Sequence, residues 1–287
     1  DVSYARTVNA NLLVFDGIPV ARHRSDSLEY LLQAIQREFG HGDLVFIATY
    51  PDWLDHVEKI ESRFMLVYDC LDDWEEFVRD LGVGKSIVVH KERKLASIAD
   101  LVIVSAKKLF VKMQRYSDKI AYLPNGVTAE DYRLEAPPPI EYRDIPEPRV
   151  FFMGALHGWV DTELIAYLAT RRPQYSFVIV GPIADNIERP ENHNIHYLGK
   201  KRYSELPAYL QHARVAIIPF KVNKLTVSVT PLKFFEYLAS GVPVVTTVMP
   251  DIIDVPGSIM ANSCEEFLEA VDMYVNMEPL SYEREAD

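Results

Sequence analysis

The chain has 287 residues, carries a formal net charge of −12, and is 48% hydrophobic. An acidic chain has no overall electrostatic attraction to nucleic acid, so we expect no nucleic-acid partner. No run of about 18 apolar residues occurs and the first residues lack a signal-peptide pattern, so neither a membrane span nor a secretory leader is expected. Two distant cysteines, Cys70 and Cys264, favour a reducing, cytoplasmic setting over a disulfide framework.

Short runs rich in β-branched residues alternate with segments of helical periodicity in the first half of the chain. The predicted strands are residues 44–50, 64–70, 100–106 and 119–124, and the predicted helices are residues 85–99 and 106–116. This alternation is typical of parallel sheets that are covered by helices on both faces.

A segment rich in proline and charge, EAPPPIEYRDIPEPR at residues 135–149, has no periodic pattern and is interpreted as an interdomain linker. A second series follows, with predicted strands at residues 150–155, 175–182, 194–200, 214–220 and 242–247 and predicted helices at residues 161–172, 203–213, 230–240 and 264–277. The pattern predicts an α/β protein of two Rossmann-like, doubly wound domains, residues 1–143 and 148–287. Ligands are expected in the cleft that the two domains face.

The segment TPLKFFEYLASGVPVV, at residues 230–245, has the pattern of a phosphate-binding helix. Thr230 is predicted to cap the helix and Pro231 to occupy its first turn. The free N–H groups there, the positive end of the helix dipole and the charge of Lys233 would suit a phosphate. Glu236 lies about 9 Å along the helix on the same side, where its carboxylate could accept hydrogen bonds from ribose hydroxyls.

The same helix is expected to bury an apolar face and to end at Gly241. That face is predicted to consist of Leu232, Phe235, Leu238 and Ala239. Taken by itself, the pattern also fits a capped amphipathic helix in any α/β protein.

This segment resembles the donor-binding motif of GT-B glycosyltransferases, in the large retaining family that includes the family 4-like transferases of bacterial teichuronic-acid and exopolysaccharide biosynthesis. The resemblance continues along the chain in LPNGV (123–127), FFMGAL (151–156), IVGP (179–182), YLGKKRYSELPAYLQHARVAIIPF (197–220) and, for the teichuronic-type subgroup, VYDCLDDW (67–74) and the pairing of Glu92 with ADLVIVSA (99–106). It implies a GT-B fold and the transfer of a sugar from a nucleoside-diphosphate donor to an acceptor hydroxyl in cell-surface polysaccharide synthesis.

The chain departs from the family pattern at three places. Ser228 stands where the wider family has a sugar-contacting Glu. The loop HGWVD lacks the Lys that often neutralises the diphosphate, so Lys221 and Lys233 are the candidates to supply that charge. The family's first strand and its last crossing helix are absent, so the first domain is expected to be incomplete.

The residues that we expect to form the site follow from these patterns and from the resemblance. Asp69 ends a predicted strand, where a ligand-facing carboxylate belongs, although a capping or surface role is the alternative there and at Asp72 and Asp73. The expected catalytic residues are Asp69, Lys221 and Lys233, and the expected donor-binding residues are Gly154, His157, Trp159, Asp161, Gly181, Ser228, Thr230, Pro231, Leu232 and Glu236. A helix cap is the alternative for Asp161.

No metal and no cofactor besides the donor are expected. The sequence contains no D-x-D motif, and His193 and His196 lie on a strand-like segment from which their side chains would not converge. It also lacks the G-x-G-x-x-G, Walker A and G-x-S-x-G patterns, which disfavours hydride transfer, P-loop chemistry and serine hydrolysis.

A basic window between residues 85 and 119 contrasts with the acidic chain. Only Glu92, Asp100 and Asp118 oppose nine cations, a balance of +6: Lys85, Lys91, Arg93, Lys94, Lys107, Lys108, Lys112, Arg115 and Lys119. The window could bind an anionic membrane that presents a lipid-linked acceptor, which would place the protein at the inner face of the plasma membrane, or it could be a solvated helix surface. The expected partners are therefore a nucleotide-sugar donor and a glycan or lipid-linked acceptor. A nucleotide-sugar epimerase and a non-catalytic nucleotide-sugar binding protein are the alternatives.

Overall fold

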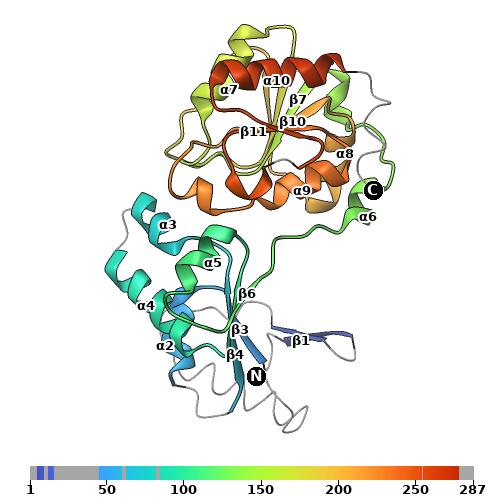
Figure 1. Ribbon diagram of the computed structural model, residues 1–287. Coiled ribbons are helices and arrows are strands. Elements are labelled where there is room, and N and C mark those ends of the chain that lie inside the picture. Colours follow the sequence, from blue (N-terminus) through green and yellow to red (C-terminus); the bar gives the residue numbers. More distant parts are fainter. Residues whose placement is uncertain are drawn as a thin grey trace.

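The computed structural model describes residues 5–9, 12–15, 45–59, 63–81, 85–253 and 255–277. The two halves of the chain form separate α/β bodies, the first drawn below the second in Figure 1. The predicted α/β class with parallel sheets is confirmed. An antiparallel pair of strands, β1 (Ala5–Asn9) and β2 (Leu12–Phe15), stands apart from both parallel sheets.

The first domain is built on a parallel four-stranded sheet in the order β3-β4-β5-β6. Its strands are β3 (Val45–Ala48), β4 (Met65–Cys70), β5 (Leu101–Val104) and β6 (Ile120–Tyr122), which lie in the four predicted runs. Its helices are η1 (Pro51–Trp53), α2 (Leu54–Val57), α3 (Trp74–Leu81), α4 (Lys85–Ile98) and α5 (Lys107–Met113). Leu66, Tyr68 and Cys70 alternate along β4 and face a core that Leu95 and Leu109 complete.

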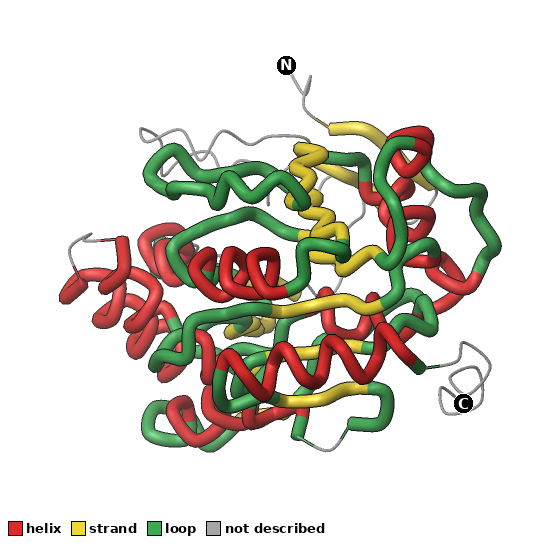
Figure 2. The backbone as a smooth tube through the Cα atoms, turned by 90° about the horizontal axis from the view of Figure 1, so that it is seen from above, coloured by secondary structure: helices red, strands yellow, loops and turns green. Residues whose placement is uncertain are grey.

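The second domain is built on a six-stranded sheet in the order β12-β11-β10-β7-β8-β9, with parallel neighbours throughout. Its strands are β7 (Arg149–Met153), β8 (Ser176–Val180), β9 (Ile195–Gly199), β10 (Val215–Ile218), β11 (Val244–Thr246) and β12 (Ser258–Met260). Its helices are α6 (Ala129–Arg133), η2 (Ile140–Arg143), α7 (Thr162–Arg171), η3 (Tyr203–Glu205), α8 (Leu206–Gln211), η4 (Thr226–Ser228), α9 (Leu232–Ala239), η5 (Pro250–Ile252) and α10 (Cys264–Asn276). In the view from above, helices flank the strands (Figure 2).

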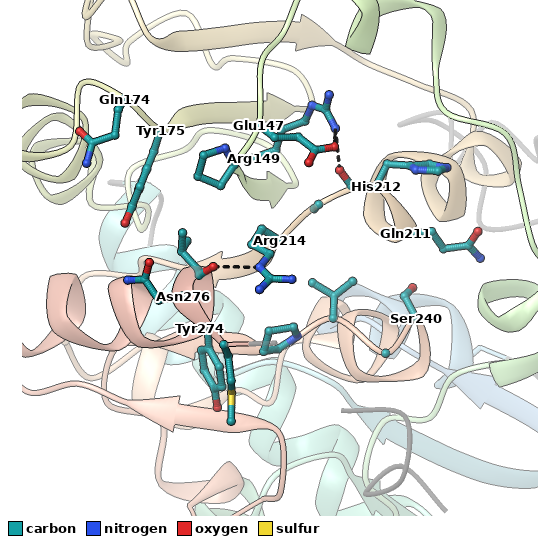
Figure 3. Close-up of a pocket in the computed structure, with 17 residues that line it drawn as sticks. Glu147, Arg149, Gln174, Tyr175, Gln211, His212, Arg214, Ser240, Tyr274 and Asn276 are labelled. Carbon is teal, nitrogen blue, oxygen red and sulfur yellow. Dashed lines mark hydrogen bonds and ion pairs between the residues drawn. The ribbon is translucent and has the colours of Figure 1, made fainter. Parts of the chain in front are cut away.

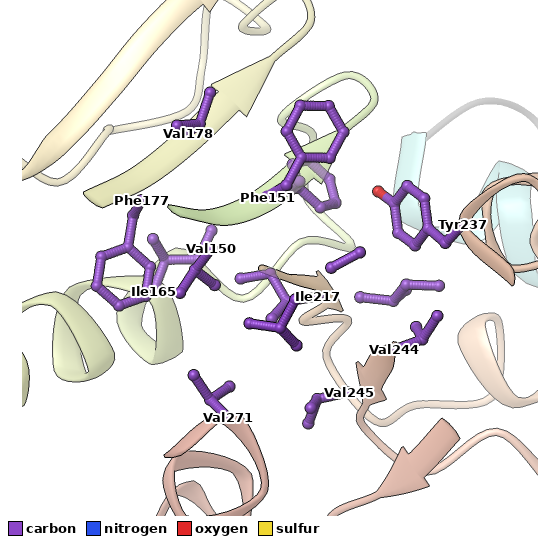
Figure 4. Packing of buried hydrophobic residues seen from close by; sticks show 14 of the residues in the cluster. Val150, Phe151, Ile165, Phe177, Val178, Ile217, Tyr237, Val244, Val245 and Val271 are labelled. Carbon is purple, nitrogen blue, oxygen red and sulfur yellow. The ribbon is translucent and has the colours of Figure 1, made fainter. Parts of the chain in front are cut away.

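The central strands of this sheet are apolar because helices cover both of their faces. Every residue of β7, β8, β10 and β11 is buried. Figure 4 shows Ile165 of α7 and Val271 of α10 on one side of these strands and Tyr237 of α9 on the other. The chain runs outward from β7 in one direction to β8 and β9 and in the other to β10, β11 and β12, so β7 and β10 flank the switch point of the sheet.

The linker segment is packed against the second domain. Tyr142 and Ile145 are buried in the second core, and so is Tyr132, which precedes the segment. The Arg149 guanidinium lies 4.4 Å from the Tyr142 ring and donates hydrogen bonds to the carbonyl oxygens of Ile145 and Tyr142. The linker is rich in proline and charge, but it is ordered, because the Tyr142 ring and Arg149 hold it against the second domain.

The carboxyl ends of the first-domain strands face the second domain. Contacts that join the two domains there include Lys107 N to Asp251 Oδ2 (2.9 Å), Lys108 Nζ to the Lys224 carbonyl (2.9 Å), Asn125 Nδ2 to the Thr230 carbonyl (2.7 Å), and the Phe77 ring to the Trp159 ring (6.1 Å between centroids). The donor segment therefore lies where the two domains meet, and the predicted cleft between them stays a prediction. Within the described residues, no helix has both the length and the apolar character needed to cross a bilayer.

Candidate functional site

Two glycines close the floor of the site at the switch point. Gly154 follows β7 with φ +136°, and Gly181 follows β8 with φ +148°, a region that side chains rarely adopt. A Cβ built on Gly181 would lie 2.1 Å from the Gly154 carbonyl oxygen, and one built on Gly154 would lie 2.5 Å from Lys233 Nζ. The loops that follow β7 and β8 therefore contact each other through backbone atoms. Because neither glycine has a side chain, a ligand in the cavity can approach this backbone closely.

A cavity of about 310 Å³ lies over these glycines, within the second domain. Its walls mix apolar side chains with two cations on one loop, one tyrosine and the polar side of α9. The lining residues are Met153, Gly154, Val180, Gly181, Pro182, Lys200, Lys201, Tyr203, Leu206, Leu232, Lys233 and Glu236. An apolar pocket with a few convergent polar groups at the switch point is the usual form of a small-ligand site.

Lys233 brings an unpaired cation to this cavity. Its ammonium lies 4.7 Å from the centre of the Phe152 ring and 4.9 Å from that of Phe220, and it has no hydrogen bond or ion pair with any described residue. Burial lowers the pKa of Lys233 to about 8, against a smaller opposite effect of Glu236. The two rings hold the charge by cation–π attraction while leaving its N–H groups free for an anion.

Glu236 supplies the facing carboxylate and is 7% exposed. Its Oε1 accepts hydrogen bonds from the hydroxyls of Tyr132 and Tyr203, both at 2.8 Å. Its Oε2 has no hydrogen-bond donor among the described residues. Positions 233 and 236 are neighbours on one side of α9, so cation and carboxylate line the same cavity as the sequence predicts.

The start of α9 differs from the prediction. The helix begins at Leu232 after Pro231, and no side chain caps it. Thr230 is therefore not its cap, because its hydroxyl donates to Asp251 Oδ2 at 3.2 Å and its carbonyl accepts from Asn125. The free N–H groups of the first turn remain, one residue further along the chain than expected.

The buried face of α9 is also different. Phe234, Glu236 and Tyr237 are buried, whereas Leu232 is 51% exposed and lines the cavity mouth. The predicted apolar face is wrong at Leu232, because the core that receives the helix lies on the side of Phe234 and Tyr237. Gly241 follows the helix at φ +71°, as the predicted stop requires.

Two expected residues upstream of α9 do not reach the cavity. Ser228 is fully buried and its hydroxyl donates to the Lys224 carbonyl at 2.5 Å. Lys221 is exposed, its backbone N–H bonds to the Trp159 carbonyl, and its side chain does not line the cavity. Of the two expected catalytic lysines, Lys233 is therefore the one that lines the cavity.

The HGWVD loop is built by stacking and capping. The rings of His157 and Trp159 stack with centroids 4.0 Å apart, and Trp159 reaches Phe77 of the first domain. His157 Nδ1 is buried without a partner among the described residues. Asp161 Oδ1 accepts from the Leu164 N–H at 2.9 Å, so it caps α7, the alternative that the sequence left open.

The acids of the first domain divide into free and paired groups. Asp69 is half-buried at the end of β4, and burial raises its pKa. Burial, with a smaller effect of Asp73, also raises the pKa of Asp72. Lys112 Nζ lies 2.7 Å from Asp73 Oδ1 and 2.8 Å from Oε2 of the fully buried Glu92.

The basic window is largely occupied by contacts within the protein. Lys91 bonds to Asp52 and Asp55, Lys112 bonds to Asp73 and Glu92, and Lys108 bonds to a second-domain carbonyl. The exposed cations of the window without a side-chain partner among the described residues are Lys94, Lys107 and Arg115. The side chain of Lys85 lies outside the described part of the structure.

A larger hollow of about 920 Å³ lies at the opposite ends of the second-domain strands (Figure 3). Arg149 and Arg214 point into the region but bond to the backbone carbonyls of His212 and Val275. Ligands of open α/β sheets bind at the carboxyl ends of strands, so the smaller cavity is the candidate site. No group of three or more His, Cys, Asp and Glu residues suited to a metal ion occurs in the part of the chain that is described.

Sequence reasoning missed the two tyrosines that hold Glu236. Tyr132 and Tyr203 lie 104 and 33 residues from it along the chain, and neither belongs to a motif with an assigned role. It also missed the aromatic pair around Lys233, although Phe152 lies inside the predicted strand at residues 150–155 and Phe220 ends the one at residues 214–220.

Similarity to known proteins agrees with this geometry. Residues 147–276 match the family described as Glycosyl transferases group 1. A Bacillus subtilis (strain 168) protein named for teichuronic acid biosynthesis, the glycosyltransferase TuaH, is 27% identical over 220 residues, which are 70% of this chain and 55% of that protein. The chain thus spans about half the length of this curated relative.

Solved structures share the whole arrangement. Sucrose-phosphate synthase from Thermosynechococcus elongatus has a TM-score of 0.74 at 14% identity, over 99% of this chain and 78% of that one. Anabaena HepE, solved with UDP and glucose, has a TM-score of 0.64 at 16% identity, over 92% and 77%. At such identities the likeness concerns the fold alone.

Two facing α/β domains with a pocket at the switch point of the second define a GT-B protein. Its second domain matches the family described as Glycosyl transferases group 1 over residues 147–276 and is similar to a curated glycosyltransferase of teichuronic acid biosynthesis.

Proposed function

We propose that the protein transfers a sugar from a nucleoside-diphosphate donor to an acceptor hydroxyl in the synthesis of a cell-surface polysaccharide. The observation that supports this most is a pair of charged side chains on one turn of α9 whose hydrogen-bonding groups are only partly satisfied by the protein. Among the described residues, the Lys233 ammonium has no anionic partner and one carboxylate oxygen of Glu236 has no donor, and both side chains line the cavity over Gly154. A diphosphate beside Lys233 and a ribose diol at Glu236 satisfy both groups at once.

The chemistry follows from where charge develops. When the bond between the anomeric carbon and the diphosphate breaks, negative charge grows on the leaving diphosphate. Lys233 and the uncapped N–H groups at the start of α9 stabilise that charge. Because these groups are protein cations and dipoles, we propose that transfer needs no divalent metal. We propose retention at the anomeric carbon on the ground of the resemblance of residues 230–245 to the retaining family.

The acceptor is assigned to the first domain, whose strands end at the contact with the second domain. Asp69 is the proposed group that receives the acceptor hydroxyl, because it is half-buried at the carboxyl end of β4.

Binding of the basic window to an anionic membrane, if it occurs, would rest on its exposed cations without a side-chain partner among the described residues, Lys94, Lys107 and Arg115. Liposome binding that persists after all three are changed to Glu would exclude that role.

Calorimetry with UDP, GDP and dTDP, followed by nucleotide-release assays with their sugars, tests the proposal. Glu236→Ala should weaken nucleotide binding about 10- to 100-fold, because a hydrogen bond to a charged group is worth about 1.5–3 kcal/mol. Glu269→Ala is the matched control, since Glu269 is exposed on α10 and away from the cavity. Release that continues in EDTA supports metal independence.

The results separate the alternatives. Failure of every nucleotide to bind would refute the donor site. Binding without release, with any acceptor preparation, would favour a non-catalytic binding protein, and an isomerised sugar would favour an epimerase. The match of residues 147–276 to the Glycosyl transferases group 1 family favours transfer over either alternative.

A further inference from the structure

One oxygen of Glu236 is shared by two phenols. The hydroxyls of Tyr132 and Tyr203 both lie 2.8 Å from Oε1, and their rings meet edge to face with centroids 6.1 Å apart. The three side chains come from α6, η3 and α9. A carboxylate oxygen has about two lone-pair positions, so both positions on Oε1 are taken in the empty protein.

The two tyrosines differ in how firmly they are held. Tyr132 is 0% exposed and part of the second-domain core, and Gln211 Nε2 donates to its carbonyl oxygen at 2.8 Å. Tyr203 is 56% exposed at the cavity wall. Tyr132 therefore cannot leave Glu236 without disturbing the core, whereas Tyr203 can rotate its ring into solvent.

A vicinal diol makes its best contact with a carboxylate when each hydroxyl donates to a different oxygen. Among the described residues, Oε1 already has two donors and Oε2 has none, so Oε2 is the oxygen available to such a hydroxyl. A ligand that brings two hydroxyls must therefore take one place from a tyrosine. The exposed Tyr203 is the one that can give way.

We propose that the Tyr203 hydroxyl occupies the place of one ribose hydroxyl in the empty site and is displaced when the donor binds, while Tyr132 remains and positions Glu236. The site then selects nucleoside diphosphates with an intact 2′,3′-diol over their 2′-deoxy forms. This inference rests on the proposed function, since it assigns the ribose to Glu236. Tyr132 acts as a positioning residue, and Tyr203 as a competing internal donor.

The two roles predict opposite effects of removing one hydroxyl. Tyr203→Phe keeps the ring at the cavity wall but frees a position on Oε1, so UDP should bind about 3- to 10-fold more tightly. Tyr132→Phe removes the fixed donor and lets the Glu236 carboxylate turn, so UDP should bind about 10-fold more weakly. Tyr197→Phe is the matched control, because its hydroxyl bonds to the Pro190 carbonyl outside the cavity.

Calorimetry with UDP and 2′-deoxyuridine diphosphate, and with GDP and 2′-deoxyguanosine diphosphate, provides the decisive measurement. The wild type should prefer the ribonucleotide about 10-fold or more, and this ratio should fall toward one in Tyr132→Phe. A ratio measured on one preparation does not depend on the fraction of folded protein, so partial destabilisation of Tyr132→Phe leaves it interpretable. A merely structural role would lower both affinities together and leave the ratio unchanged.

The outcomes separate this inference from the proposed function. Wild-type protein that binds none of the four nucleotides refutes both. Wild-type binding of UDP or GDP with unchanged or weaker binding in Tyr203→Phe, or an unchanged ratio in Tyr132→Phe, overturns the tyrosine inference and leaves the donor site standing. Tighter binding in Tyr203→Phe together with a lost ratio in Tyr132→Phe supports the exchange.

Discussion

The two domains differ in how they surround a lysine that is largely removed from water. In the first, Lys112 is held between Asp73 and Glu92, and Lys91 between Asp52 and Asp55. In the second, Lys233 lies between two aromatic rings and has no carboxylate partner among the described residues. Lys112 and Lys233 are both largely removed from water, but within the described part of the chain only Lys112 has carboxylates within hydrogen-bond distance.

Whether a buried lysine has a carboxylate partner distinguishes a structural role from a ligand-binding role more clearly than its residue type does. Burial costs a cation its hydration, and an acid within hydrogen-bond distance compensates for the loss. Where carboxylates lie within hydrogen-bond distance of the cation, as at Lys112, the ion pairs serve the fold. Where the described residues offer none, as at Lys233, we propose that the cation serves an anion from outside.

The largest effect is expected from Lys112→Ala. The substitution leaves Glu92, which is fully buried, and Asp73 without their cation, so the first domain should lose about 3–5 kcal/mol of stability. Urea unfolding followed by the fluorescence of Trp53 and Trp74 measures the loss. Lys94→Ala, at an exposed position on α4, is the control and should change stability by less than about 0.5 kcal/mol. A loss below about 1 kcal/mol for Lys112→Ala would contradict the paired role.

A pH dependence of donor binding is the next largest effect. The pKa of Lys233 in the empty protein is lowered to about 8, and a bound diphosphate favours the charged form and raises it. Binding therefore takes up a proton above pH 8, and affinity for UDP should fall by up to about 10-fold per pH unit there. Calorimetry in buffers of different ionisation enthalpy measures the uptake. Lys233→Met should bind weakly at all pH values and show no such slope.

The same shift has the opposite sign for the stability of the empty protein. The unfolded chain keeps the Lys233 proton up to its ordinary pKa of 10.5, whereas the folded protein releases it near 8. The free energy of unfolding should therefore rise between about pH 8 and pH 10.5 by the contribution of this one group. A difference in slope between wild type and Lys233→Met isolates that contribution, and equal slopes would show that burial does not shift this pKa.

The smallest effect concerns Asp161. Because Asp161 caps α7, Asp161→Ala should cost about 1 kcal/mol of stability and leave UDP affinity unchanged. Ser263→Ala, which removes the equivalent cap of α10, should behave in the same way. A loss of donor affinity in Asp161→Ala but not in Ser263→Ala would show that Asp161 also contacts the ligand.

Much of the fold could be predicted because its signals are local. Runs such as LVIV and SFVIV form strands wherever both faces are covered, and each strand–helix alternation implies a parallel neighbour. Glu236 and Lys233 could be placed together because three residues span less than one helical turn. The buried face of α9 could not be predicted, because apolar residues surround most of the helix. The packing of the core decides which of them are buried.

Long-range partners lay beyond the sequence. A charge count over residues 85–119 shows nine cations, but Asp52, Asp55 and Asp73, which pair with two of them, stand outside that window. The role of Thr230 changed for the same reason, because Asp251 accepts the hydroxyl that a cap would have used. The sequence identifies the charged and polar side chains, but tertiary packing determines which of them pair with each other.

The glycine floor also determines where donor preference can be altered by engineering. A substitution at Gly181 would collide with the Gly154 carbonyl, and one at Gly154 would collide with the Lys233 ammonium. Libraries that vary the floor should therefore yield mostly inactive variants. The exposed rim at Lys200, Tyr203 and Leu232 tolerates new side chains and still borders the cavity, so it is the place to diversify.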